Sequence, residues 1–99
     1  MKSGIYEYVF ANGDNYIGQA VDITKRWDQH IAKMEKGTHT KLIQAAYNMQ
    51  GLPRFRVILE CHPHYLDAFE SLYIYDLKPS LNGNQPAHYL TRSLDINVS

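Results

Sequence analysis

Arg26 and His30 are the first residues in this sequence whose types and spacing suit chemistry. They stand four residues apart, so a helix would place both side chains on one face. A guanidinium binds phosphate oxygens, and an imidazole exchanges protons near neutral pH. The simpler interpretation is a solvated helix edge with an extended arginine, and the spacing alone favours it.

Glu70 is the next candidate. It follows Phe69 and precedes Tyr73 by three residues, at the margin of an apolar helical face. A carboxylate there is costly unless it is paired or bound to a metal ion. An ion pair with Arg26, a hydrogen bond and a bound metal ion all satisfy this requirement, and the pattern alone favours the first two.

The elements that must position these side chains follow from hydrophobic periodicity and turn residues. Asp22 and Thr40 are predicted to cap two helices, and Gly37 is predicted to end the first of them in a left-handed conformation. We expect strands at about 4–10, 15–20 and 55–60, and helices at about 23–36, 41–49 and 65–77. This order predicts an α+β fold, with a three-stranded sheet that is centred on an antiparallel hairpin and flanked by helices.

The composition limits the classes of function. Ten basic and ten acidic residues cancel, which argues against a protein that coats nucleic acid nonspecifically. Eight of the basic residues lie among the first 56 positions, so a local basic face is compatible with the zero net charge. No apolar run approaches the length of a membrane span, and one cysteine cannot form an internal disulfide. We expect a single cytoplasmic domain without a membrane partner.

Cys61, His62 and His64 offer one alternative chemistry. Thiolate and imidazole are both zinc ligands. Their spacing, interrupted by Pro63, matches no recognised structural zinc site. A loop that happens to contain two histidines is the more economical interpretation.

Two tripeptides stand on either side of the predicted hairpin turn, Gly4-Ile5-Tyr6 and Tyr16-Ile17-Gly18. Together they resemble the paired signature of the GIY-YIG nuclease family. The resemblance covers about residues 1–84 and is closest to the catalytic domains of phage intron-encoded homing endonucleases. Further matching positions are Arg26, His30, His39, Glu70 and Asn82.

The resemblance implies hydrolysis of DNA phosphodiesters with one divalent ion, Mg²⁺ or Mn²⁺. It implies that Glu70 binds the metal ion, that Arg26 binds phosphate and that Tyr6 is the general base. A phenol at its ordinary pKa is about one-thousandth ionised at pH 7, a handicap of roughly 4 kcal/mol that a nearby cation reduces. The implied catalytic residues are Tyr6, Tyr16, Arg26, His30, His39, Glu70 and Asn82.

The remaining roles are less closely defined. His30 and His39 are expected to relay a proton or to bind phosphate. Tyr16 would position water or phosphate, and Asn82 would orient a phosphate or a tyrosine hydroxyl. Any DNA-binding face should be built from Lys25, Arg26, Lys33 and Lys41, with Arg54 and Arg56 as further candidates.

The organisation of the chain bears on specificity. Residues 1–84 are expected to form the nuclease-like domain, and residues 85–99 a C-terminal tail or a short edge element. Homing endonucleases carry a separate DNA-binding module, and this sequence ends at Ser99. We therefore expect limited sequence specificity, or a homodimer, or a separate specificity partner, in a phage-encoded protein of the host cytoplasm. The alternative is a noncatalytic module on the same fold that binds nucleic acid or protein.

The hairpin register decides whether the two tripeptides share a site. A two-residue turn at Asn12-Gly13 would point Tyr6 and Tyr16 to opposite faces of the sheet. One common site requires both rings on the same face. The sequence therefore predicts an odd-numbered loop or a bulge around residues 12–14.

Overall fold

The computed structural model describes residues 2–83, and the prediction for residues 85–99 lies outside them. Three antiparallel strands form one sheet in the order β2-β1-β3, with β1 at Gly4–Val9, β2 at Asn15–Ala20 and β3 at Arg54–Glu60. Helices α1 (Ile23–Lys36) and α2 (Lys41–Gln50) precede β3, and α3 (Leu66–Leu77) follows a single 3-10 turn, η1 (Pro63–Tyr65). The predicted α+β architecture is confirmed.

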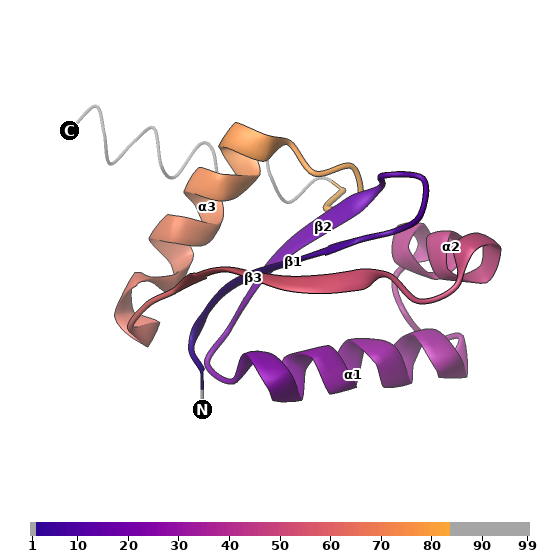
Figure 1. Ribbon diagram of the computed structural model, residues 1–99, viewed down its shortest axis with the longest axis horizontal. Helices are drawn as coiled ribbons and strands as arrows, with labels where there is room; N and C mark the ends of the chain where they lie inside the picture. The colour runs from indigo at the N-terminus through magenta and orange to yellow at the C-terminus, as the bar shows by residue number, and fades with distance from the viewer. Residues whose placement is uncertain (1, 84–99) are drawn as a thin grey trace.

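The sheet is covered on both faces, with α1 and α3 on opposite sides of it (Figure 1). One face carries an aromatic core in which Tyr6, Tyr8 and Phe10 pack with Met34 of α1 and Ile43 of α2. The other face packs a smaller aliphatic cluster against α3, formed by Ile5, Ile17, Leu66 and Ile74. Because side chains alternate along each strand, the even-numbered residues of β1 face α1 and the odd-numbered ones face α3.

The hairpin loop has the odd length that the sequence predicts. The Phe10 amide donates to the Asp14 carbonyl at 2.8 Å, which leaves three residues at the tip. Gly13 takes a left-handed φ of 95° there, a conformation that glycine adopts without steric cost. Tyr8 consequently pairs with Tyr16, and Tyr6 lies on the same face of the sheet as both.

The predicted helix ends are confirmed in position. Asp22 accepts a hydrogen bond from the Lys25 amide, and Gly37 ends α1 with a φ of 74°. Thr40 occupies the N-cap position of α2 as predicted, but its side chain makes no capping hydrogen bond. The Thr40 amide and hydroxyl lie instead 2.8 and 3.4 Å from Nδ1 of His39.

None of the helices within residues 2–83 is both long enough and apolar enough to span a lipid bilayer.

Candidate active site

Two signature glycines make room for the chemistry of the hairpin. A Cβ at Gly18 would lie 2.5 Å from Oη of Tyr6 and 2.9 Å from the Tyr16 ring, so only glycine lets the Tyr6 ring lie across β2. A Cβ at Gly4 would collide with the Leu59 carbonyl on β3. Gly18 is therefore required by close packing against the buried phenol of Tyr6, and Gly4 by its close approach to the backbone of β3.

Three tyrosines gather on this face. Tyr6 is 1 % exposed and Tyr8 is fully buried, while Tyr16 remains partly exposed on the edge strand β2. The rings of Tyr8 and Tyr16 stack with centroids 5.0 Å apart, and those of Tyr6 and Tyr16 lie 6.4 Å apart. The structure thus brings the two signature tyrosines together, and it adds Tyr8, which the sequence motifs did not single out.

His30 projects from α1 into this cluster and is 8 % exposed. Its Nε2 lies 2.7 Å from Oη of Tyr6, and its Nδ1 lies 2.7 Å from Nε2 of His39 and 3.3 Å from Oη of Tyr8. Burial, followed by the charges of His39, Arg26 and Lys33, lowers the pKa of His30 to about 3. His30 is therefore a neutral imidazole at neutral pH.

His39 continues the same line of contacts. Its ring stacks on His30 with centroids 5.0 Å apart, and its Nδ1 accepts a hydrogen bond from the Thr40 amide. Burial, and then the charge of Lys33, lowers the pKa of His39 below its usual value. Both predicted histidines lie in one chain of contacts that ends at Tyr6.

Arg26 lies on the exposed surface of α1, one turn before His30. Its charge lowers the pKa of Tyr6, whereas burial, Tyr16 and Glu70 raise it, burial most of all, so that the net shift is upward. Arg26 and Glu70 therefore both act on the same phenol. They come from α1 and α3, which lie on opposite sides of the sheet.

Glu70 is 6 % exposed on α3, as its position beside the apolar face predicts. Its Oε1 accepts a hydrogen bond of 3.1 Å from Nε2 of Gln19, and the same nitrogen donates to Asp67 at 2.7 Å. A hard carboxylate that is buried beside the signature strand suits Mg²⁺ or Mn²⁺, which take one or two carboxylates and complete their shells with water and phosphate oxygens. Within residues 2–83 no group of three or more His, Cys, Asp or Glu side chains could hold a metal ion, so any ion at Glu70 depends on such oxygens.

The side chain of Asn82, predicted to orient a phosphate or a tyrosine hydroxyl, binds the backbone of β2. Its Oδ1 accepts from the Ile17 amide at 3.0 Å and its Nδ2 donates to the Ile17 carbonyl at 2.8 Å. This bidentate contact pairs the side chain with the open edge of β2. The immediate effect of Asn82 is to fix the strand that carries Tyr16 and Gly18.

The predicted DNA-binding residues separate into two groups. Lys25, Arg26 and Lys33 are exposed on α1, and Lys41 is exposed at the start of α2. Arg56 lies elsewhere, because its Nε donates to the Glu7 carboxylate at 2.6 Å on the face covered by α3. Arg56 is thus engaged away from the tyrosines, which follows from its pairing with Glu7 across the sheet.

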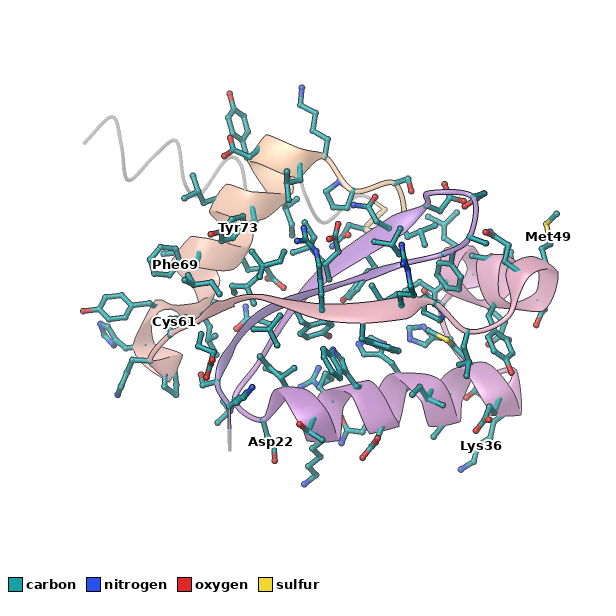
Figure 2. The ribbon with its side chains drawn as sticks, in the orientation of Figure 1. Asp22, Lys36, Met49, Cys61, Phe69 and Tyr73 are labelled. Atoms are coloured by element: carbon teal, nitrogen blue, oxygen red, sulfur yellow. The ribbon has the colours of Figure 1, made fainter. Side chains whose placement is uncertain are left out.

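The zinc alternative is wrong for residues 61–64. The described part of the chain contains no three-residue metal-binding group. Cys61 packs with Phe69 and Tyr73 on the aliphatic cluster of the sheet (Figure 2), and Nδ1 of His62 accepts the His64 amide at 3.0 Å. These residues therefore form the turn that leads into α3.

Comparisons with known proteins agree with this geometry. The sequence matches the family described as the GIY-YIG catalytic domain over residues 2–84. It is 36 % identical over 88 residues to intron-associated endonuclease 1 of Enterobacteria phage T4, an alignment that covers 84 % of this chain and 36 % of that protein. This chain therefore spans about a third of the length of that relative.

Two solved structures share the fold. One is the catalytic domain of the homing endonuclease I-TevI, with a TM-score of 0.73 and 30 % identity, covering 83 % of this chain and 95 % of that one. The other is a mutant of the catalytic domain of intron endonuclease I-TevI, with a TM-score of 0.72 and 28 % identity, covering 87 % and 90 %. The likeness extends over nearly the whole of each solved domain.

Proposed function

The chain belongs to the GIY-YIG catalytic-domain family, and on that premise we propose that it is a divalent-metal-dependent endonuclease that hydrolyses DNA phosphodiesters. The observation that carries the proposal is the convergence on Tyr6. A guanidinium from α1 and a carboxylate from α3 both act on that one phenol. A phosphodiester bound between them would meet a cationic ligand, a metal ligand and a hydroxyl.

Glu70 would hold one Mg²⁺ or Mn²⁺ ion. When bound, the ion would stabilise the negative charge that develops on the phosphate and on the leaving oxygen. Gln19 holds Oε1 of Glu70 by a hydrogen bond, so the carboxylate enters the reaction already oriented. Arg26, exposed beside the site, would bind a nonbridging phosphate oxygen through its planar fork.

Tyr6 would orient the attacking water and take up its proton. Burial raises the pKa of Tyr6 above its usual range and Arg26 offsets part of this rise, so Tyr6 is protonated in the protein alone. Its base role therefore depends on positive charge that joins the site with the substrate. Tyr16, on the exposed edge strand, would position water or phosphate beside it.

We expect DNA to contact the exposed cations of α1 and of the start of α2, which are Lys25, Arg26, Lys33 and Lys41. With a net charge of zero over the chain, we expect weak, salt-sensitive binding and limited sequence specificity. A second subunit or a separate partner would supply further specificity. The phage relative favours action on DNA in the cytoplasm of an infected host.

Plasmid cleavage tests the proposal. We expect scission with Mg²⁺ or Mn²⁺, none with a chelator, and a loss of about 100-fold or more in Glu70→Gln and Arg26→Ala, as for the removal of one charge-stabilising group. Asp76→Asn on α3 and Lys2→Ala before β1, both exposed and outside the proposed site, are the matched controls and should cut normally. Full activity in Glu70→Gln would contradict the mechanism, and metal-independent DNA binding without scission would favour the noncatalytic module.

A further inference from the structure

A continuous line of hydrogen bonds runs from the start of α2 to the signature phenol. The Thr40 amide lies 2.8 Å from Nδ1 of His39, Nε2 of His39 lies 2.7 Å from Nδ1 of His30, and Nε2 of His30 lies 2.7 Å from Oη of Tyr6. Each imidazole thus uses both of its nitrogens. A neutral imidazole carries one donor and one acceptor. The first group in the line therefore determines which nitrogen of each histidine carries the proton.

That first group is a backbone amide, which only donates. Nδ1 of His39 must therefore be an acceptor without a proton, and the proton of the neutral ring lies on Nε2. This N–H donates to Nδ1 of His30, which must also be without a proton. The proton of His30 consequently lies on Nε2 and is donated to Tyr6.

Tyr8 reinforces the same arrangement at its centre. Its Oη lies 3.3 Å from Nδ1 of His30, and its ring is fully buried and meets the His30 ring edge-on with centroids 5.1 Å apart. Burial, and then the neighbouring Tyr16 and Tyr6, raise the pKa of Tyr8. Tyr8 therefore remains a phenol whose proton points to the bare nitrogen.

We propose that Tyr8 and the backbone amide of Thr40, neither of which belongs to the signature, are positioning groups that fix the proton of His30 on Nε2 and so make His30 a hydrogen-bond donor to Tyr6. His30 then cannot take the proton of Tyr6, because the nitrogen that faces Tyr6 already carries one. Its donated hydrogen bond stabilises negative charge on the Tyr6 oxygen and turns the hydroxyl proton of Tyr6 away from the histidines. This inference rests on the proposed function only for its effect on cleavage.

Nitrogen-15 NMR of the imidazole rings tests the inference in the full chain, without DNA or metal. We expect His30 and His39 both to carry their protons on Nε2. A proton on Nδ1 of His30 in the parent protein would overturn the proposal. This measurement needs no variant, so it decides the question even where a substitution fails to fold.

Substitutions at Thr40 separate the amide from the side chain. Thr40→Pro removes the N–H at a residue whose φ of −58° suits proline, and Thr40→Ala keeps the N–H while removing the hydroxyl. We expect the first to convert His39 to a mixture of tautomers and the second to leave the tautomer unchanged. Identical tautomers in Thr40→Pro and Thr40→Ala would refute the role of the amide.

Tyr8→Phe removes one hydroxyl and keeps the packed ring. We expect kcat to fall about tenfold with an unchanged KM, the rate equivalent of one hydrogen bond. We also expect a minor Nδ1 tautomer of His30 to appear, because one of the two donors to that nitrogen is lost while His39 still donates. Tyr47→Phe, which alters another partly buried ring of the same core, is the matched control and should change neither. An unchanged His30 tautomer and kcat in Tyr8→Phe would refute the role of Tyr8.

The two proposals fail separately. If His30 and His39 carry their protons on Nε2 but the protein does not cut DNA, the proposed function is wrong and the positioning roles of Tyr8 and the Thr40 amide stand. Metal-dependent cutting by a protein whose His30 carries its proton on Nδ1 would do the reverse.

Discussion

Acidification from pH 7 to pH 5 should destabilise this protein through His30. Burial, followed by the neighbouring His39, Arg26 and Lys33, lowers the pKa of His30 from 6.5 to about 3. Protonation would also place two N–H donors face to face in the 2.7 Å contact between His30 and His39. The folded state therefore binds fewer protons than the unfolded state between about pH 3 and pH 6.5.

The direction and size of this change in the free energy of unfolding follow from proton linkage. The free energy of unfolding is highest above pH 6.5 and falls as the pH drops toward the folded-state pKa of about 3. Each pH unit well inside this window costs up to about 1.4 kcal/mol per histidine, so His30 alone costs about 2 kcal/mol between pH 7 and pH 5. His39, whose pKa is also lowered, adds to the loss in the same direction.

Urea unfolding at half-unit pH intervals from 7 to 5 measures this slope. His30→Gln should lose most of the pH dependence, whereas His64→Gln, at an exposed position of η1, should keep that of the parent. Aspartate and glutamate at their ordinary pKa values remain mostly ionised over this range. A parent slope near zero, or the same slope in His30→Gln, would refute the view that His30 is held neutral by burial.

Three further outcomes follow from the packing. Gly18→Ala should lower the free energy of unfolding by about 1–3 kcal/mol and lose cleavage, because its Cβ would displace Tyr6; a urea midpoint and a cleavage rate equal to those of the parent would contradict this. Asn82→Ala should lower the free energy of unfolding by about 1–3 kcal/mol, because it leaves a buried amide and carbonyl of β2 without their partner. The urea midpoint measures this loss, and a midpoint equal to that of the parent would mean that water replaces those bonds. Arg56→Ala leaves Glu7 with one remaining side-chain partner, Nδ2 of Asn15 on β2. The free energy of unfolding should fall by about 1 kcal/mol with unchanged cleavage, and slowed cleavage would show that this ion pair contributes to the reaction.

Much of the fold could be predicted because its signals are local. The Asp22 cap, the left-handed Gly37 and the short loop before β2 depend on backbone preferences within a few residues. The odd length of the hairpin loop could be predicted, because Tyr6 and Tyr16 lie on the same face of the sheet only when the loop contains an odd number of residues. Tyr8 lies on the face of Tyr6 because the two are separated by one residue in β1, and the odd loop places Tyr16 opposite Tyr8.

The contacts of the candidate site could be predicted only in part. Helical spacing placed Arg26 beside His30, and the apolar margin of α3 placed Glu70 in a buried position. Thr40 was predicted as a cap, yet its amide binds His39. This contact is itself local, because His39 directly precedes Thr40. A hydrogen bond between a side chain and a nearby backbone group competes with helix capping, and cap preference alone does not rank the two.

The sequence by itself determined the order of the elements, and the signature tripeptides, read with strand alternation, predicted the shared face of the tyrosines. Only the tertiary structure decided that His30 faces Tyr6 with one nitrogen and His39 with the other, and that Asn82 pairs with the edge of β2. The physical reason is the distance along the chain over which each kind of interaction acts. Dihedral preferences and side-chain periodicity act over a few residues and can be read along the chain, whereas a hydrogen bond between residues 24 or 65 positions apart depends on how the helices settle on the sheet.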